Sequence, residues 1–394
     1  MIPGWKVKRE FDRFWQQLRA GIGLIWEPFV QRRYDRMRES IITISDGARP
    51  AQEKVAVYLI FQPKEILKST LQTCRMLDAS GYAPFIVSNA PLPPDALAAL
   101  GQVSWRIMQR PNYGYDFGGY RDGILHLRKS GITPDKLLVM NDSIWYPLGE
   151  VDTLLSRLEA SGLDVAGTIV HRGFRKTLLR RRATRVIESY LFLFSAKAIQ
   201  SRAFESFWGN YRMSSIKYNA VHRGERRVAE TMLAAGLSAD GLFGREEFMQ
   251  AIATQNDGFL RDTLRYGAYT DDHLAEECAA LLSEPTEAAN WRSRALDHVA
   301  RTTLKRNFHG AFVFASMQLL DMPYLKKGTG TFLKRSYGTL YTRMRAQYVA
   351  AVMANDLLAP RVDVLAEIIE RDDIKSAASI GILADANSIG NEVV

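Results

Sequence analysis

Residues 112–124 read NYGYDFGGYRDGI, and residues 140–148 read MNDSIWYPL. In the first stretch, Gly114, Gly118 and Gly119 lie among aromatic residues and a carboxylate, which suggests a backbone brought close to a ligand. In the second stretch, an apolar run ends abruptly in Asn-Asp-Ser. Polar residues at the end of a buried strand are where open α/β sheets bind ligands. Together the two stretches predict an enzyme that holds a nucleotide-linked substrate.

The segments around these stretches alternate between short apolar runs and helical patterns. The apolar runs are typical of buried strands and span residues 55–61, 83–89, 103–110, 136–140, 163–170 and 189–195. Helical periodicity falls between or after them, at residues 64–81, 119–130, 150–162 and 225–236. This alternation predicts an α/β fold, doubly wound around a mostly parallel sheet with flanking helices.

Composition and pattern divide the chain into four parts. We expect residues 1–45 to form a basic helical segment with an apolar face. We expect a catalytic α/β domain over residues 53–245, a helical, arginine-rich C-terminal region over 246–375 and a weakly ordered tail over 376–394. The N-terminal segment is either an amphipathic helix on an anionic membrane surface or a helix packed on the main domain.

The composition is that of a globular protein, with 394 residues, 47% of them hydrophobic and 24% charged. Two cysteines, Cys74 and Cys278, exclude a disulfide framework and a cysteine-rich zinc site, which fits a reducing compartment. No apolar run reaches the roughly 18 residues of a transmembrane helix, and the N-terminus is too charged for a signal peptide. We therefore expect a cytoplasmic protein, either free or at the inner face of the cytoplasmic membrane.

A third segment carries a candidate general base. Residues 222–243 read HRGERRVAETMLAAGLSADGLF and predict a helix that begins near Glu225 and ends at Gly236. In the first turn, the helix dipole favours the ionised form of Glu225, and an ionised carboxylate near the end of a sheet can act as a base. The alternative is that Glu225 only stabilises the helix, as acidic residues at helix starts commonly do.

In combination these segments resemble the family 2 nucleotide-sugar glycosyltransferases, which have a GT-A fold. Asn112-Tyr-Gly114 falls at that family's Asn-x-Gly turn, and Asn141-Asp-Ser143 falls at its Asp-x-Asp position. Glu225 stands eleven residues before Gly236, which is about the spacing of the family's base carboxylate.

The chain more closely resembles the rhamnan synthesis protein F family, whose members are described as rhamnosyltransferases of bacterial polysaccharide and lipopolysaccharide assembly. That family's Asn-x-Gly-x-Asp-Phe-Gly-Gly-Tyr run and its strand ending in Asn-Asp-Ser are present nearly verbatim. Weaker matches are Glu188-Ser-Tyr-Leu191 to a Gln-Ser-Tyr-Phe strand and Pro323-Tyr-Leu-Lys326 to a Pro-Phe-x-Lys segment. The resemblance covers roughly residues 53–330.

The resemblance implies transfer of a sugar from a nucleoside diphosphate sugar, with dTDP-rhamnose as the expected donor, to a glycan or lipid-linked glycan. Glu225 would be the base of an inverting reaction, and Asp142 the second catalytic residue. The expected donor-binding residues are Phe61, Asn89, Asn112, Gly114, Asp116, Gly118, Gly119, Tyr120, Asn141 and Ser143. Candidates for contact with the diphosphate or the acceptor are Arg172, His222 and Arg226.

The Asn-Asp-Ser sequence departs from the metal-binding pattern of GT-A enzymes, because Asn141 and Ser143 stand where that pattern has carboxylates. Asp142 remains as a candidate ligand, and Mg²⁺ commonly binds one or two carboxylates plus substrate phosphates. Dependence on Mg²⁺ or Mn²⁺ therefore stays open. Without a metal, arginines such as Arg172 and Arg226 would neutralise the leaving diphosphate.

Three other functions stay open at this point. A retaining glycosyltransferase on the same fold would not need a base at Glu225. A non-catalytic scaffold or peripheral membrane protein of polysaccharide assembly would keep a degenerate GT-A fold. The net charge of +9 would also suit nucleic acid, but the basic residues are spread over several segments, so we expect no nucleic-acid partner.

Overall fold

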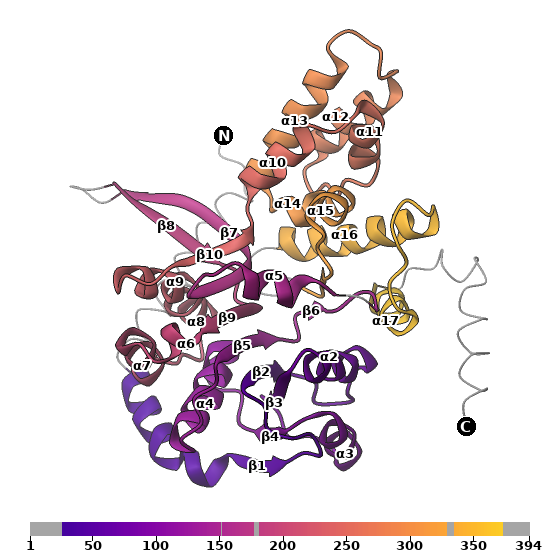
Figure 1. Ribbon diagram of the computed structural model, residues 1–394. Coiled ribbons are helices and arrows are strands. Elements are labelled where there is room, and N and C mark those ends of the chain that lie inside the picture. The colour runs from indigo at the N-terminus through magenta and orange to yellow at the C-terminus, as the bar shows by residue number, and fades with distance from the viewer. Residues whose placement is uncertain (1–25, 151, 177–180, 329–334, 373–394) are drawn as a thin grey trace, which may run out of the picture. The chain divides into compact units, whose positions relative to one another are not determined.

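The structure is a computed structural model, and it describes residues 26–150, 152–176, 181–328 and 335–372 (Figure 1). Two expectations, for the N-terminal residues 1–25 and for the tail at 376–394, lie outside the described residues. The chain forms two compact units, the first comprising the residues up to Ile66, Cys74–Asp142 and Arg157–Leu242, and the second comprising the rest. Within the described ranges, no helix combines the length and the apolar character needed to cross a membrane.

A nine-stranded sheet is the centre of the first unit. Its order is β1-β4-β3-β2-β5-β9-β7-β10, and β8 pairs with β7 at the side. The strands are β1 (Thr43–Asp46), β2 (Lys54–Ile60), β3 (Tyr82–Ser88), β4 (Arg106–Gln109), β5 (Lys136–Asn141), β7 (Val165–Lys176), β8 (Arg181–Ile187), β9 (Leu191–Ser195) and β10 (Ala239–Phe243). Strands β2 to β5 are parallel to one another.

The predicted α/β fold class, with a mostly parallel central sheet, is confirmed. Strands β2 and β3 are buried along nearly their whole length, as expected of strands covered on both faces. The sheet is extended antiparallel at both sides, because β1 pairs with β4 and β9 pairs with both β5 and β7. The strands expected at 163–170 and 189–195 therefore exist, but they run antiparallel to their neighbours.

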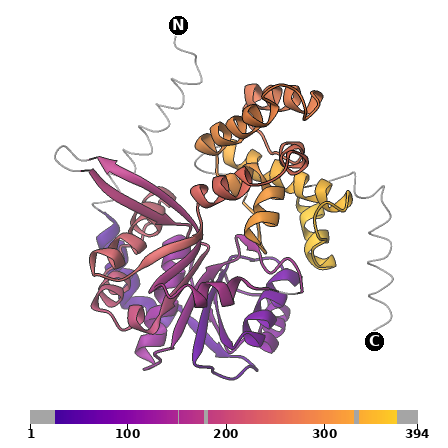
Figure 2. The same cartoon turned by 45° about the horizontal axis from the view of Figure 1, so that its top comes forward.

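Helices cover the sheet of the first unit (Figures 1 and 2). They are a helix at residues 26–41, α3 (Pro94–Val103), α4 (Tyr115–Lys129), α6 (Ala196–Ile199), α7 (Arg202–Gly209), α8 (Lys217–Arg223) and α9 (Glu225–Ala234). Helix α4 packs against β2 and β3, so the glycine-rich run lies directly on the parallel core.

The strand order creates a topological switch point between β2 and β5. From β2 the chain moves to β3 and β4 on one side, and then returns to β5 on the other side of β2. In open α/β sheets, ligands bind in the crevice outside the carboxyl ends of the strands at such a point. Phe61 follows β2 and Asp142 follows β5, so both candidate residues stand at this edge.

The helix at residues 26–41 is packed on the first unit. Its Glu27 is buried and forms an ion pair of 2.6 Å with Arg223. Its Asp35 receives two hydrogen bonds from Arg121 of α4, at 2.7 and 3.1 Å. For the described part of the N-terminal segment, the structure thus shows packing on the main domain.

The second unit is mainly helical, in agreement with the expected helical C-terminal region. Its helices are α10 (Arg245–Ala253), α11 (Asp257–Arg265), α12 (Asp272–Ser283), α13 (Trp291–Lys305), α14 (Phe308–Ala311), α15 (Val313–Leu320), α16 (Arg335–Met353) and α17 (Val362–Asp372). A short antiparallel pair, β6 (Ile144–Trp145) with β11 (Leu325–Lys326), completes it. The boundaries between the units fall within α2 (Lys68–Ala79) and α5 (Leu154–Ala160) and also after Ile66, Asp142 and Leu242.

A carboxylate on α17 holds the chain segments of the second unit together. Glu367 accepts hydrogen bonds from the backbone nitrogen and the hydroxyl of Ser69, at 2.9 and 2.6 Å. Its Oε2 also accepts one of 2.8 Å from the indole nitrogen of Trp145. These bonds explain why the segments around Ser69 and Trp145 belong with the C-terminal helices.

Candidate functional site

The two stretches singled out from the sequence meet where the parallel strands end. Asp116, in the first turn of α4, accepts a 3.0 Å hydrogen bond from the side-chain amide of Asn141, the last residue of β5. Asp142 Oδ2 accepts hydrogen bonds from the backbone nitrogen of Phe61 (3.0 Å) and from the amide of Gln62 (2.9 Å). The Asn-Asp-Ser turn therefore holds both the start of α4 and the loop after β2 at the switch point.

The buried phenol of Tyr120 is subject to the charges of the three candidate carboxylates. Its side chain is fully buried, and its hydroxyl donates a 2.9 Å hydrogen bond to the backbone oxygen of Ser189. Burial raises the pKa of Tyr120 well above its usual value, and the negative charges of Asp116, Asp142 and Glu225 raise it further. The negative charges of three carboxylates, at the ends of three different elements, therefore all disfavour ionisation of the Tyr120 phenol.

The start of α9 is held close to the start of α4. Gly224, which separates α8 from α9, packs so tightly on Phe117 that a Cβ atom at Gly224 would lie 2.4 Å from the aromatic ring. Phe117 belongs to the first turns of α4, and Glu225 is the first residue of α9. This contact accounts for the electrostatic influence of Glu225 at Tyr120, and Glu225 itself is partly exposed.

Gly118 and Gly119 have a packing role in the structure. A Cβ atom at Gly118 would lie 2.1 Å from the carbonyl oxygen of Tyr113, and one at Gly119 would lie 2.0 Å from Cδ1 of Leu59. Both glycines are buried within α4, so they allow the helix to approach the preceding turn and the sheet. The two glycines therefore allow the α4 backbone to come close to other protein atoms, and not to a ligand as the sequence suggested.

Replacing Gly118 with alanine should lower the free energy of unfolding by about 1–3 kcal/mol, because the backbone around Tyr113 must shift to make room. The matched control is Gly101→Ala in α3, where a Cβ atom would meet nothing within 4 Å. That change should raise stability by roughly 0.5–1 kcal/mol, since alanine favours the helix over glycine. Urea unfolding measures both, and equal effects of the two changes would contradict the packing role.

The turn before α4 has an unusual backbone. Gly114 has a φ of 85°, and Tyr115, which carries a bulky side chain, has a φ of 52°. Positive φ is uncommon for such a residue and marks a constrained segment. Asn112, the first residue of the glycine-rich run, is exposed at this turn, so it is available for contact with a ligand.

A buried ion pair holds this turn and was missed by the sequence analysis. Arg110 and Asp122 have fully buried side chains, and Nε of Arg110 lies 2.7 Å from Asp122 Oδ2. The Arg110 guanidinium also donates to the carbonyl oxygen of Tyr113 and to the side-chain oxygen of Asn89. Tyr34, from the helix at residues 26–41, donates a further 2.6 Å bond to Asp122.

Asn89 therefore has protein partners on both ends of its amide. Its oxygen accepts from Arg110, and its nitrogen donates to the carbonyl oxygen of Tyr115 at 3.4 Å. The side chain is buried, with 3% of its surface exposed. The geometry gives Asn89 a role in positioning the turn before α4, alongside its expected role in donor binding.

The basic candidates lie on other elements. Arg172 of β7 donates a 3.0 Å bond to Asp240 of β10, and Arg226 is exposed in the first turn of α9. The ring of His222, on α8, lies 5.8 Å from that of Tyr218. Ser143 begins the segment that belongs to the second unit, where its carbonyl oxygen accepts a bond from the Lys327 backbone.

The residues at the strand ends do not form a preformed metal site. In the part of the chain that the structure describes, no three histidine, cysteine, aspartate or glutamate side chains are arranged to hold a metal ion. Asp142 Oδ2 accepts two hydrogen bonds from protein donors, and Asp116 Oδ2 accepts one from Asn141. A metal ion would have to take its remaining ligands from the substrate.

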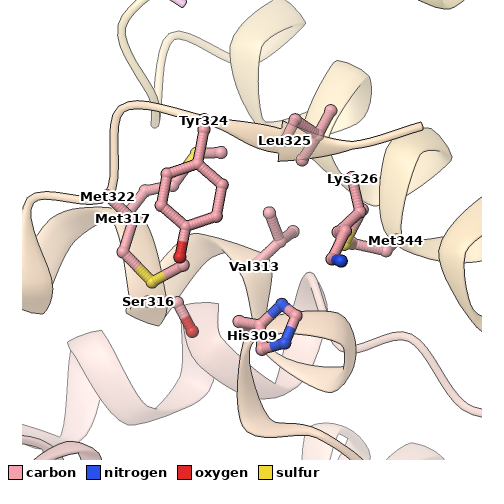
Figure 3. A pocket seen from close by; sticks show the side chains of 9 residues that line it. All are labelled: His309, Val313, Ser316, Met317, Met322, Tyr324, Leu325, Lys326 and Met344. Carbon is pink, nitrogen blue, oxygen red and sulfur yellow. The ribbon is translucent and has the colours of Figure 1, made fainter. Parts of the chain in front are cut away.

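Two cavities lie away from this site. Figure 3 shows one in the second unit, with His309, Val313 and Tyr324 among its lining residues; its volume of about 10 Å³ suits roughly one water molecule. The other, in the first unit, has a volume of about 340 Å³ and lies beside Arg38, Met108 and the C-terminal half of α4. Neither is lined by the residues gathered around Tyr120.

Comparison with known proteins gives matches of three kinds. A family model described as rhamnan synthesis protein F matches residues 85–262, a range that includes both sequence stretches and Glu225. The uncharacterized protein y4gN of Sinorhizobium fredii is 30% identical over 267 residues, which is 68% of each chain. A solved mannosyltransferase of Pyrobaculum calidifontis, in complex with GDP-Man and Mn²⁺, is 8% identical with a TM-score of 0.30, over 86% of this chain and 98% of its own.

Proposed function

The chain belongs to the rhamnan synthesis protein F family, and from this premise we propose that it is a glycosyltransferase. It would move a sugar from a nucleoside diphosphate sugar to a glycan or lipid-linked glycan acceptor. The observation that carries the proposal is that Asn141 joins Asp116 to the end of β5, Asp142 joins the loop after β2, and Gly224, next to Glu225, packs on Phe117 near the start of α4. The carboxyl edge of the sheet, at a topological switch point, is the usual ligand site of open α/β sheets.

The donor nucleotide would lie beside the loop after β2. Phe61 is 53% exposed although it is aromatic, and its backbone is fixed by Asp142. An exposed aromatic ring can stack on a nucleotide base. The exposed Asn112 and the turn at Gly114 would face the ribose or the sugar, and Asp116 and Asn141 would bind sugar hydroxyls.

The reaction would proceed by a single displacement. Glu225 takes the proton from an acceptor hydroxyl, the acceptor oxygen forms a bond to the anomeric carbon, and the bond from that carbon to the diphosphate oxygen breaks. Attack from the opposite side inverts the configuration, through an oxocarbenium-like transition state of the kind known from glycosidases. Asp142, through its hydrogen bonds to the loop after β2, would keep the donor in line.

The leaving diphosphate needs positive charge nearby, because it gains negative charge as its bond to the anomeric carbon breaks and the nearby Asp116 and Asp142 are acidic. Arg226 follows Glu225 directly and is exposed at the start of α9, so it is our candidate for this role. Mg²⁺ or Mn²⁺, if bound through Asp142 and the phosphates, would supply the same charge. No step of the proposed reaction depends on a metal ion.

A panel of nucleotide sugars in a thermal-shift assay tests the donor class. The panel would contain dTDP-rhamnose, UDP-glucose, GDP-mannose and the free nucleotides, each with and without Mg²⁺ or Mn²⁺. Because the family name refers to rhamnan, we expect dTDP-rhamnose to raise the unfolding temperature most. A bound ligand stabilises the folded protein, and at about 100 times its Kd it adds about 2.7 kcal/mol to the free energy of unfolding. No shift with any nucleotide sugar would contradict the proposal, and binding without transfer would favour a non-catalytic scaffold.

A further inference from the structure

The cavity of about 340 Å³ in the first unit has no part in the proposed reaction. Its lining comes from the end of the helix at residues 26–41, from β1 and β4, and from the last turns of α4 (Figure 1). This volume is in the range of pockets that bind small organic ligands. Asp116 and Lys129 lie at opposite ends of α4, about 20 Å apart along its axis, so the cavity is separate from the strand-end site.

Part of the cavity wall is apolar. Ile44 of β1 stands directly opposite Met108 of β4 in the antiparallel register, and Ile42 precedes β1. All three side chains line the cavity. Met108 is buried, whereas Ile44 is 41% exposed although it is aliphatic. This part of the wall suits the apolar portion of a ligand.

The electrostatic potential at another part of the wall is positive. Burial lowers the pKa of the His126 ring, and the charges of Arg106, Arg38 and Lys129 lower it further. Asp46 acts in the opposite direction but is outweighed by these three cations. The ring is therefore neutral near pH 7, and the cavity favours a negatively charged ligand.

Arg38 is the cation that the carboxylates around the cavity leave without a close partner. Each of these carboxylates is paired with another basic residue: Glu39 with Lys129, Asp46 with Arg106 at 2.9 Å, and Asp122 with Arg110 at 2.7 Å. The Arg38 guanidinium lies 3.9 Å from Asp122 Oδ1, which is beyond hydrogen-bond distance. Among the residues that the structure describes, none accepts a hydrogen bond from this guanidinium, although its side chain is only 20% exposed.

We propose that this cavity binds a small amphipathic anion, with a carboxylate or phosphate group on the Arg38 guanidinium and an apolar part against Ile44 and Met108. A mostly buried guanidinium without hydrogen bonds is unfavourable, because its donors lose water and gain no acceptor. Two oxygens of one anionic group match the two parallel donors of an arginine. The proposal does not depend on the proposed glycosyltransferase activity.

Titrations followed by ligand-observed NMR test the site with four probes. Butyl phosphate and hexanoate carry the two kinds of anionic group on a short chain, inorganic phosphate lacks the chain, and 1-hexanol lacks the charge. Burial of each CH₂ group adds about fourfold to affinity, so butyl phosphate should bind the full chain at least about 10-fold more tightly than inorganic phosphate. Hexanoate should bind more tightly than 1-hexanol, and the tighter of the two anions identifies the preferred anionic group.

The variant Arg38→Gln should bind both anions about 10-fold more weakly or worse, because it loses charge-assisted hydrogen bonds. The matched control is Arg36→Gln, which is exposed on the same helix outside the cavity and should bind like the parent. Ile44→Ser should weaken butyl phosphate binding by about threefold or more and leave inorganic phosphate unchanged. Thermal unfolding confirms that each variant is folded.

Three results would overturn the proposal. The first is parent-level binding by Arg38→Gln, or an equal loss in Arg36→Gln. The second is the absence of saturable binding of either anion to the parent, or binding of 1-hexanol as tight as that of hexanoate. The third is displacement of the bound anion by dTDP-rhamnose, because that would place the anion at the strand-end site. Failure of dTDP-rhamnose to bind would contradict the proposed function but leave the cavity site standing.

Discussion

Replacing Glu225 with glutamine should slow sugar transfer by about 10²–10⁴-fold, which is the usual contribution of a general base. Glutamine keeps the size and polarity of the side chain but cannot take the proton from the acceptor hydroxyl. The donor does not need that proton transfer to bind, so its affinity should stay nearly constant. Initial rates at saturating donor, together with a thermal shift on adding donor, measure the two effects separately.

The control for this change is Glu230→Gln, at a position in the interior of the same helix, α9. The rate of sugar transfer by this variant should stay within about a factor of two of the parent's rate. The anomeric configuration of the product gives a second readout. Inversion with a slow Glu225→Gln variant supports the single displacement. Normal turnover by that variant, or retention of configuration, would remove Glu225 from the role of base.

Replacing Arg110 with methionine should lower the free energy of unfolding by about 3–5 kcal/mol, since buried Asp122 would lose its close ion pair. It would keep only the Tyr34 hydroxyl and the more distant guanidinium groups of Arg121 and Arg38, at 3.8 and 3.9 Å. Both side chains are fully buried, and Arg110 also donates to Asn89 and to the carbonyl oxygen of Tyr113. The loss should appear as a lower midpoint in urea or thermal unfolding. Donor affinity should fall as well, because the turn before α4 loses its main anchor.

A surface ion pair on the same helix provides the comparison. Arg128 of α4 lies 2.5 Å from Glu205, but their side chains are 39% and 60% exposed. Exposed pairs contribute little, so Arg128→Met should cost less than about 1 kcal/mol. The double change Arg110→Met/Asp122→Asn should recover part of the loss, because it also removes the buried charge. An Arg110→Met protein as stable as Arg128→Met would show that the buried pair does not hold the turn.

Much of the parallel core could be predicted from the sequence, because each strand is a short apolar run bounded by turn residues. The expected strand at residues 136–140 corresponds to β5, and the expected helix start at Glu225 is where α9 begins. The start of α4 was placed too late, at 119, because Gly118 and Gly119 were interpreted as backbone brought close to a ligand. In the structure they are helical, and their lack of a side chain permits close packing.

The parts that could not be predicted depend on contacts between distant residues. The strands β1, β8 and β10 were missed. β1 and β10 pair with strands far away in the chain, whereas β8 is a basic segment that pairs with the neighbouring strand β7. The ion pair of Arg110 with Asp122 was also missed. One residue ends a strand and the other lies in α4, and no spacing rule shows that both are fully buried. In the structure, Asn141 at the end of β5 donates a hydrogen bond to Asp116 of the glycine-rich run.

The most direct test of the account is a calorimetric titration of dTDP-rhamnose into the parent protein and into the Phe61→Ala variant. Phe61 is 53% exposed, so the variant should keep its fold, and Phe29→Ala, with 61% exposure, is the matched control. Loss of base stacking costs about 1–3 kcal/mol, so Phe61→Ala should bind roughly 5- to 150-fold more weakly, whereas Phe29→Ala should bind like the parent. Absence of saturable binding in the parent, or equal affinity in all three proteins, would contradict a nucleotide-sugar site at the ends of β2 and β5.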